Sequence, residues 1–410
     1  MTASLGRPEW LTAPAPAAVL DALEAVGGPD CARFVGGCVR NALLGQPISD
    51  IDLATTLTPD VVTKALRASK IRAVPTGVEH GTVTAVFRGH PVEVTTLRRD
   101  VETDGRRAVV AFTTDWLKDA ERRDFTLNAL YARRDGRIDD PTGQGVADAH
   151  AGRIVFVGDP ELRLREDYLR ALRFFRFLAW YGRGEPDAAA VAAITALRGG
   201  VATLAAERIS AELLKLLAAE DPRPAVRLMR ETGVFEIVLP AGQDRARFEA
   251  LVGIEQALGA ADRLLRLAAV LPDDPAEGTR AAERLRLSNA ECDRLQTALT
   301  PAPELAPGLD AHDLRVALHR KGAPAVRDRL KLNWAGAGGG DAASWRPLLD
   351  HADGWAAMSL PVSGADVLAA GAPKGRRVGE LLRALEDWWI DGDFQAGREA
   401  TLARLRELME

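Results

Sequence analysis

The chain has 410 residues, of which 47% are hydrophobic and 27% charged, a composition typical of globular proteins. This composition excludes a chain that is disordered throughout, and the length favours about two to four domains. The formal net charge of −5 excludes nucleic-acid binding driven by overall charge, so a polyanionic partner would have to be held by local arginine clusters.

The N-terminal segment, residues 1–20, contains several prolines and lacks the basic start and apolar run of a secretory signal. No stretch of the chain reaches the roughly 18 apolar residues of a membrane span. The cysteines, Cys31, Cys38 and Cys292, are odd in number and lie outside any metal-ligand spacing, as expected for reduced thiols. We therefore expect a soluble, cytoplasmic protein with no membrane partner.

From Cys31 to about Asp140, short apolar runs alternate with helical stretches, which predicts a small mixed α/β domain. From Pro160 onward, apolar residues recur at three- and four-residue spacing between Gly- and Pro-rich breaks, which predicts helices. The expected strands cover 33–35, 51–54, 82–87 and 92–97. The expected fold class is α+β: a mixed-sheet head (1–150), followed by an all-helical neck (151–215), body (216–300) and tail (301–410).

Two aspartates mark the candidate catalytic centre. Asp50 and Asp52 flank Ile51 in a segment that reads as a strand, so alternation sends both carboxylates to one face. Mg²⁺ takes carboxylate oxygens, and two such ions can clamp the attacking and leaving oxygens of an in-line displacement. Glu93 is the candidate third acid. For an isolated triplet, two solvated acids at a strand end would be the better interpretation, but the preceding residues favour a metal site.

Those preceding residues form a candidate phosphate-binding segment. Gly36 and Gly37 stand between an expected strand and an expected helix, where glycines let the backbone approach a triphosphate. Arg40 adds a positive charge three residues later. A lone pair of glycines is more often a plain turn, but the combination with Arg40 and the acid pair is a strong signal.

With this segment, the chain resembles the class II tRNA nucleotidyltransferases of the DNA polymerase β superfamily, which include CCA-adding enzymes and bacterial poly(A) polymerases. Specific motifs carry the resemblance over roughly the first 215 residues. It implies a nucleotidyltransferase head in which Asp50 and Asp52 hold catalytic Mg²⁺ and Gly36, Gly37 and Arg40 hold the nucleotide. The family usually has an acid where this chain has Asn41.

The run 121–131 resembles the family's second motif, which binds the sugar and phosphates of the incoming nucleotide. Arg123 and Asn128 are the residues that this resemblance assigns. A guanidinium can grip phosphate, and an amide can donate to and accept from a ribose hydroxyl. Taken alone, the segment Arg122 to Asp124 would be better interpreted as a solvated helix start.

The run 165–176 resembles the family's amino-acid template, in which Asp167 and Arg170 pair with the incoming base. On a helix, Arg170, Arg173 and Arg176 would lie opposite an apolar stripe, where Arg173 and Arg176 extend the nucleotide-binding surface. A carboxylate acceptor beside a guanidinium donor fits cytosine and adenine. Guanine and uracil would leave buried polar groups unpaired, at about 1–3 kcal/mol each. The alternative is an ordinary i, i+3 surface ion pair between Asp167 and Arg170.

The resemblance also narrows the predicted activity. The run 207–212 resembles a motif that closes the neck, although an ion-pair cluster on a helix surface explains it equally well. The polar run 98–107 is expected to be a loop of the kind that helps CCA-adding relatives switch from CTP to ATP. The basic cluster Lys374 to Arg377 precedes an expected amphipathic helix and could contact tRNA phosphates.

The predicted function is addition of C, C and A to the 3′ end of tRNA, with tRNA, CTP and ATP as partners and no DNA expected. One alternative is a bacterial poly(A) polymerase or an enzyme that adds only A. Another, of a different class, is a non-catalytic RNA-binding protein with a decayed transferase head, an idea motivated by Asn41.

Overall fold

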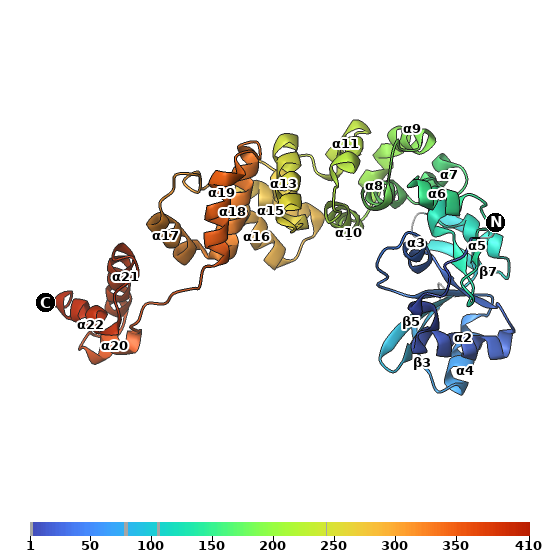
Figure 1. Ribbon diagram of the computed structural model, residues 1–410, viewed down its shortest axis with the longest axis horizontal. Helices are drawn as coiled ribbons and strands as arrows, with labels where there is room; N and C mark the ends of the chain where they lie inside the picture. The colour runs from blue at the N-terminus through green and yellow to red at the C-terminus, as the bar shows by residue number, and fades with distance from the viewer. Residues whose placement is uncertain (1–2, 78–80, 105–106, 243) are drawn as a thin grey trace. The chain divides into compact units, whose positions relative to one another are not determined.

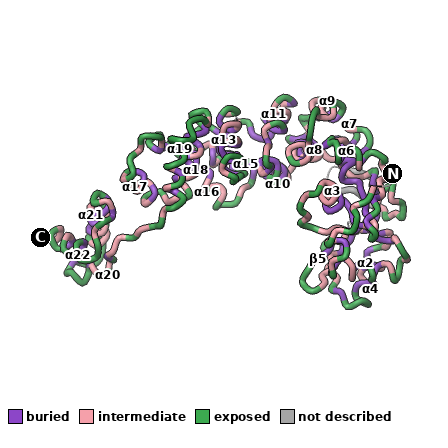
Figure 2. The backbone as a smooth tube through the Cα atoms, in the orientation of Figure 1, coloured by how far each residue is buried: buried purple, intermediate pink, exposed green. Residues whose placement is uncertain are grey.

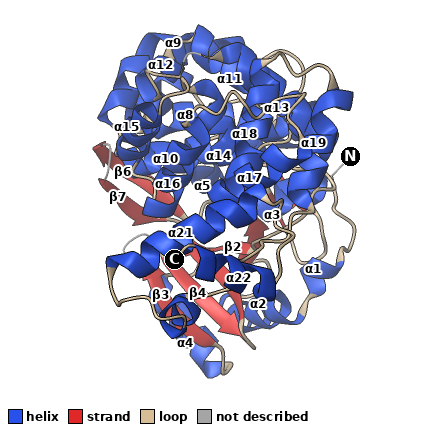
Figure 3. Ribbon diagram, turned by 90° about the vertical axis from the view of Figure 1, so that its left-hand side faces the viewer, coloured by secondary structure: helices blue, strands red, loops and turns tan. Residues whose placement is uncertain are grey.

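The computed structural model describes residues 3–77, 81–104, 107–242 and 244–410, which fold as two compact units, Met1–Pro240 and Ala241–Glu410. All strands lie in the first 140 residues, and the remainder is helical (Figures 1 and 3). The predicted α+β class is therefore confirmed. No helix in the described part of the chain is long and apolar enough to cross a membrane. The predicted boundaries of head, neck, body and tail stay predictions.

A seven-stranded mixed sheet forms the head, in the order β3-β4-β5-β2-β1-β8-β9. Its strands are β1 (Ala32–Val35), β2 (Asp52–Thr55), β3 (Arg72–Gly77), β4 (Thr82–Phe87), β5 (His90–Thr96), β8 (Tyr131–Ala132) and β9 (Ile138–Asp139). The β2 and β5 strands pair in parallel, while the other neighbours are antiparallel. The four predicted strands are thus present, and only their ends differ.

Helices α2 (Pro14–Gly27) and α4 (Pro59–Ala68) pack on the sheet and bury its apolar side chains. In β5, Val92 and Val94 are buried and the intervening Glu93 is exposed, as period-two alternation requires. The remaining head helices are α1 (Glu9–Thr12), α3 (Gly37–Leu43), α5 (Trp116–Glu121), the 3₁₀ turn η2 (Thr126–Asn128) and α6 (Gly145–Ala151). This arrangement leaves the carboxylates of Asp52 in β2 and Glu93 in β5 outside the core.

The segment predicted as a polar loop is a β-hairpin instead. Strands β6 (Arg98–Asp104) and β7 (Arg107–Phe112) form a separate two-stranded antiparallel sheet with a register shift between Asp100 and Glu102. The tip at 105–106 lies outside the described residues. The loop prediction was wrong because strands pair through hydrogen bonds between backbone N–H and C=O groups. A segment with a polar sequence can therefore still form a strand beside the next segment of the chain.

The rest of the first unit is helical: α7 (Pro160–Glu166), α8 (Leu169–Tyr181), α9 (Ala188–Leu197), η3 (Arg198–Thr203), α10 (Ala206–Leu217), α11 (Arg223–Glu231) and α12 (Val234–Val238). A single helix was expected across 165–176, but Asp167 is extended, with φ −157° and ψ 105°, and separates α7 from α8. The apolar side of α8 packs on the head, where Phe174 and Phe177 contact Phe125. Buried and exposed residues alternate along these helices (Figure 2).

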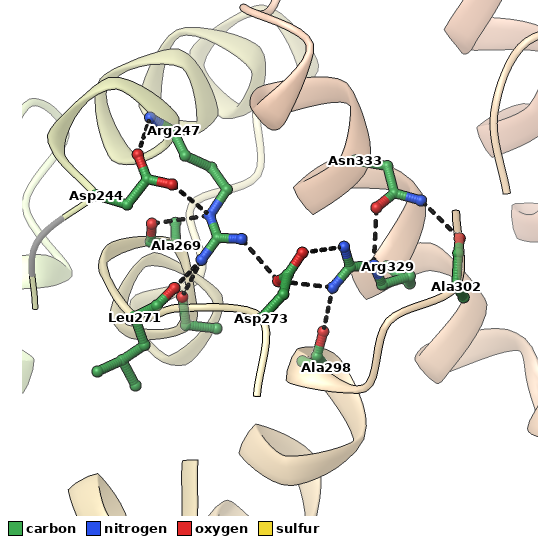
Figure 4. A network of polar contacts seen from close by, with 10 residues as sticks. Asp244, Arg247, Ala269, Leu271, Asp273, Ala298, Ala302, Arg329 and Asn333 are labelled. Atoms are coloured by element: carbon green, nitrogen blue, oxygen red, sulfur yellow. Dashed lines mark hydrogen bonds and ion pairs between the residues drawn. The ribbon is translucent and has the colours of Figure 1, made fainter. Parts of the chain in front are cut away.

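The second unit consists of α13 (Arg245–Leu258), α14 (Arg263–Val270), α15 (Pro275–Leu285), α16 (Asn289–Leu299), α17 (Ala311–Lys321), α18 (Ala323–Gly336), α19 (Ala342–Asp353), α20 (Gly364–Ala369), α21 (Arg376–Asp391) and α22 (Arg398–Glu407). Figure 4 shows a polar network inside it: the Asp273 carboxylate accepts hydrogen bonds from Arg247 at 2.7 Å and from Arg329 at 2.8 Å. Because both arginines are buried, this carboxylate ties α13 and α18 to the connection after α14.

Candidate nucleotidyl-transfer site

Three carboxylates lie close together on the main sheet, where the interior strand β2 begins beside β5. Asp52 is the first residue of β2, Asp50 lies in the connection just before it, and the parallel register places Asp52 beside Glu93 of β5. All three side chains line one pocket of about 740 Å³. The structure therefore brings together the three acids that the sequence singled out, although the strand begins one residue later than expected.

The electrostatics of this site favour a cation. Burial, together with the nearby carboxylates of Glu93 and Asp50, raises the pKa of Asp52 from 3.8 to about 6, and the more distant Arg123 opposes the shift only in part. Within the described residues, no group of three or more His, Cys, Asp and Glu side chains is arranged as a ready-made metal cage. The donors thus fit a hard divalent cation in chemistry, and the substrate's phosphates would have to complete its coordination.

Gly36 connects β1 to α3 with φ +72° and ψ −122°, a conformation that residues with a side chain rarely adopt. A Cβ at this position would lie 3.7 Å from Nη1 of Arg123, and one at Gly37 would lie 3.8 Å from Nη2 of Arg40. Both distances are ordinary van der Waals contacts, so the positive φ of Gly36, rather than a lack of space, is what favours glycine there. The two glycines lie next to the two arginines that the sequence analysis placed beside a triphosphate.

Arg40 of α3 is 7% exposed and held by neutral groups. It donates to Oδ1 of Asn128 at 2.5 Å, to Oδ1 of Asn41 at 2.8 and 3.1 Å, and to the Tyr181 hydroxyl at 2.7 Å. Its guanidinium also lies 4.1 Å from the centre of the Tyr181 ring. Tyr181 belongs to α8, so this arginine connects the glycine segment to the neck.

Arg123 is held by Asp119, which the sequence analysis missed. The Asp119 carboxylate is buried and accepts hydrogen bonds from Arg123 at 3.0 and 3.3 Å, from Arg122 at 2.7 and 2.8 Å, and from the Tyr131 hydroxyl at 2.7 Å. Burial alone would raise the pKa of Asp119, but Arg123 and Arg122 outweigh it and hold the pKa at about 2. The ionised carboxylate therefore fixes Arg123 in place.

Asn128 of the head is connected to α8 through Asp124. Its Nδ2 donates to Oδ1 of Asp124 at 2.9 Å, while Nε of Arg173 donates to Oδ2 of the same carboxylate at 2.8 Å. Arg173 also lies 3.7 Å from Glu212 of α10, and Arg176 lies 2.6 Å from it. The predicted sugar-binding amide and two predicted base-facing arginines thus belong to one polar chain.

Asp167 and Arg170 lie close together in sequence but do not pair with each other. Asp167 accepts from Nη2 of Arg208 at 2.7 Å, while Arg170 forms an ion pair with Glu166 and donates to the carbonyl of Arg163 at 2.7 Å. The i, i+3 surface pair, which was the alternative interpretation, is therefore not formed. Both side chains are held by α7, α8 and α10 at the break between α7 and α8.

A second pocket, of about 470 Å³, lies between α3 and α8. Its lining includes Gly37, Arg40, Asn41, Arg176, Phe177, Trp180, Tyr181 and Lys215. It shares Ser49, Asp50 and Asp52 with the first pocket, so the two aspartates stand where both pockets meet. A carboxylate pair between two pockets is suited to join two substrates, one in each.

The residues that the sequence analysis missed share one property: each positions another side chain of the site. They are Asp119, Asp124, Tyr181, Arg208 and Glu212. For Asp119, the available signal was its spacing of three and four residues before Arg122 and Arg123, which is the spacing of helical ion pairs. For Asp124 it was the four-residue spacing to Asn128, and for Arg208 and Glu212 it was the run 207–212, which was noted without a role for either residue. Tyr181 contacts residues far away in the chain.

Two known families match parts of the chain: the poly A polymerase head domain over residues 32–155, and the probable RNA and SrmB-binding site of polymerase A over residues 185–244. The mitochondrial CCA tRNA nucleotidyltransferase 1 of Danio rerio is 33% identical over 92% of this chain and 87% of its own length. The CCA-adding enzyme of Bacillus pumilus is 37% identical over 58% of this chain and 60% of its own length.

Solved structures agree with these sequence matches. The crystal structure of the Bacillus stearothermophilus CCA-adding enzyme in complex with CTP superposes with a TM-score of 0.76 at 28% identity, covering 96% of this chain and 97% of that one. The Thermotoga maritima CCA-adding enzyme complexed with tRNA has a TM-score of 0.69 at 19% identity, over 96% of this chain and 94% of that one, and shows the shared fold.

Proposed function

The chain belongs to the family of class II CCA-adding tRNA nucleotidyltransferases and poly(A) polymerases, and from this premise we propose how its residues divide the work of nucleotide transfer. The activity is addition of C, C and A to the 3′ end of tRNA, with CTP and ATP as nucleotide substrates and no nucleic-acid template. The observation that carries the assignment of the catalytic centre is the convergence of Asp50, Asp52 and Glu93 in one pocket, with the two aspartates also lining a second pocket.

Asp50 and Asp52 are the proposed metal ligands, with Glu93 beside them on β5, and Mg²⁺ is the proposed ion. When bound, this ion lowers the pKa of the tRNA 3′-hydroxyl and stabilises the charge that develops on phosphorus. The carboxylates supply hard oxygen donors, and the raised pKa of Asp52 indicates negative charge that a cation would neutralise. The parallel pairing of β2 with β5 fixes the spacing between Asp52 and Glu93.

Arg123 and Arg40 are the proposed triphosphate residues, and Gly36 with Gly37 gives the nucleotide access to them. Arg123 keeps N–H groups on its Nη1 side, next to Gly36, while Asp119 holds the opposite side of the guanidinium. Arg40 has fewer free N–H groups and contributes mainly its charge. Asn128 is the proposed ribose contact.

Asp167 and Arg170 are the proposed base-selecting residues. In the structure each already has a partner, Arg208 and Glu166 respectively, so the incoming base would compete with those partners or add to them. Because Asp167 is 27% and Arg170 13% exposed, each has some surface available to a ligand. Arg173 and Arg176, held by Asp124 and Glu212, would extend this surface.

The two alternatives, poly(A) or A-only addition and a non-catalytic RNA-binding role, have less support than CCA addition. The β6–β7 hairpin occupies the position at which CCA-adding relatives carry their switching segment, and its presence favours the full CCA activity. A decayed, non-catalytic head would have no need for fixed catalytic side chains, yet Arg40, Arg123 and Asn128 are all held by specific partners. The catalytic interpretation is therefore the better one.

The tail is the proposed tRNA contact. Lys374, Arg376 and Arg377 are exposed at the start of α21, where cations can meet phosphates. Arg376 and Arg377 share one carboxylate, that of Glu380, at 3.0 and 3.6 Å. The positive stretch between residues 315 and 331 is a weaker candidate, because each of its paired cations has a different carboxylate as its partner. These cations are Arg315, Arg320, Lys321, Arg327 and Arg329.

The test is an incorporation assay with tRNA that lacks its terminal CCA, supplied with each nucleoside triphosphate in turn and with CTP and ATP together. We expect CTP to enter twice and ATP once, and UTP and GTP at least about a hundredfold less well. Incorporation of UTP as readily as CTP would contradict the assignment of Asp167 and Arg170. Long A tracts on an unstructured RNA would indicate poly(A) activity instead.

A further inference from the structure

Asn41 stands in α3 where the family usually has an acid, and its side-chain amide joins two parts of the site. The oxygen end, Oδ1, accepts hydrogen bonds from Arg40 at 2.8 and 3.1 Å and from the Tyr181 hydroxyl at 3.3 Å. The nitrogen end, Nδ2, donates to the carbonyl of Pro47 at 2.8 Å. Because a guanidinium can only donate and a carbonyl can only accept, these partners fix which end of the amide is which.

The nitrogen end acts on the segment that carries the first catalytic acid. Residues 46–51 have no regular secondary structure and lead directly to β2. A second hydrogen bond also holds this segment to position 41, because the backbone N–H of Gln46 donates to the backbone carbonyl of Asn41 at 2.8 Å. Asp50 follows three residues after Pro47, so the position of its carboxylate depends on how firmly this segment is held.

The oxygen end acts on the charge of Arg40. Arg123, Arg170, Arg173 and Arg176 each pair with a carboxylate. Across the described residues, no carboxylate forms an ion pair with Arg40, whose hydrogen-bond partners at this site are amides and a phenol. Its positive charge therefore has no carboxylate in direct contact, and Asp124 acts on it only across Asn128, although Arg40 is 7% exposed.

An aspartate at position 41 would change both effects. Its carboxylate could accept from Arg40, but it has no N–H to donate to Pro47, and a negative oxygen would face the carbonyl oxygen of that residue. The carboxylate would also neutralise Arg40. Asparagine and aspartate are nearly the same size, so this difference comes from hydrogen bonding and charge rather than from packing.

We propose that Asn41 is a positioning residue whose amide holds the segment leading to Asp50 against α3 while leaving the Arg40 charge available to the nucleotide triphosphate. The inference rests on the proposed function, in which Asp50 binds metal and Arg40 acts on phosphate. The inference gives a role to Asn41, which stands where the family usually has an acid.

The first test compares the full-length wild-type chain with Asn41→Asp and Asn41→Ala by hydrogen exchange of peptides covering residues 44–52, without nucleotide or metal. Loss of the amide donor should speed exchange in this segment by about five- to tenfold in both variants. Gln46→Glu is the charge-matched control, because it adds a negative charge to the same segment and keeps the Asn41 amide. Exchange in this control should match the wild type.

The second test measures CTP binding without tRNA, together with the Mg²⁺ concentration that gives half-maximal CTP addition to tRNA. Asn41→Asp should weaken CTP binding about tenfold and Asn41→Ala clearly less, because only aspartate neutralises Arg40. Both variants should need more Mg²⁺, with an unchanged KM for tRNA. A general loss of folding would instead lower the active fraction without moving these constants.

The outcomes distinguish the role proposed for Asn41 from the proposed function of the whole chain. Wild-type exchange and CTP binding in both Asn41 variants, beside an active wild-type enzyme, would overturn the role of Asn41 and leave the proposed function intact. A wild-type chain that adds no nucleotide to tRNA would refute the proposed function itself. If Asn41→Asp does not fold, Asn41→Ala still decides whether the amide holds the 44–52 segment.

Discussion

Replacing Asp119 with asparagine should destabilise the head and loosen Arg123. The ionised carboxylate accepts hydrogen bonds from two guanidinium groups, the Tyr131 hydroxyl and the Arg98 backbone amide, and its side chain is 1% exposed. An asparagine cannot carry the charge, and its N–H groups would face donors. The substitution therefore removes the attraction and leaves two partly buried cations without a carboxylate partner at this position.

The size of the effect follows from the pKa of Asp119. Arg123 and Arg122 lower this pKa, against the effect of burial, from 3.8 to about 2. Since each tenfold change in proton affinity is worth about 1.4 kcal/mol, the charged form stabilises the fold by about 2.5 kcal/mol at neutral pH. A lowered pKa means that this contribution is complete above pH 4 to 5 and is lost as the pH falls toward 2.

Urea unfolding, followed by hydrogen exchange of peptides from α5 to β8, measures this difference at several pH values. The matched control is Glu121→Gln on the same helix, because Glu121 forms an exposed, solvent-screened ion pair with Lys118, so its loss should have a much smaller effect. Asp119→Asn should also raise the KM for CTP, since Arg123 loses its fixed position. Equal effects of the two substitutions, or a deficit in Asp119→Asn that persists unchanged at pH 2, would refute the reasoning.

Three further predictions concern other parts of the chain. Asp52→Ala should reduce transfer by about a thousandfold or more without lowering the melting temperature, and EDTA should abolish wild-type activity until Mg²⁺ is restored; retained activity would remove Asp52 from the metal site. Arg208→Ala frees Asp167 and should raise misincorporation of UTP several-fold, with little effect on stability, as read from sequenced products. Arg266→Ala leaves the buried Glu255, among the described residues, with only the Asp262 backbone amide as a donor and should cost about 3–5 kcal/mol in urea unfolding of the second unit at about pH 8, whereas a cost below about 1 kcal/mol would refute a stabilising role of this ion pair.

The main sheet and the close placement of the three candidate acids could be predicted from the sequence because their signals are local. Alternation along β5 places Glu93 opposite Val92 and Val94, and a short apolar strand follows Asp50 and Asp52. The same local rule failed at Asp167. A helical spacing of apolar residues continues through this position, yet the carboxylate accepts from the Leu169 amide and from Arg208 of α10, which stabilise an extended residue there.

The partners of the site could not be predicted because they are distant in sequence. Tyr181 lies 140 or more residues from Asn41 and Arg40, and Arg173 lies 49 residues from Asp124. Spacing rules concern residues within one helix or strand, and a single sequence carries no information about which surfaces meet. The β6–β7 hairpin was also not predicted, because hydrogen bonds between main chains form strands without requiring an apolar sequence pattern.

Asp124 also has a consequence for movement within the first unit. Its carboxylate is shared between Asn128 in the head and Arg173 on α8, and its side chain is 10% exposed, so water has little access to replace either contact. A rotation of α8 must first break the bond to Arg173, which has Glu212 at 3.7 Å as its nearest other carboxylate. Until that exchange happens, Asn128, the proposed ribose contact, and α8, which carries the proposed base-selecting Arg170, stay linked through one carboxylate.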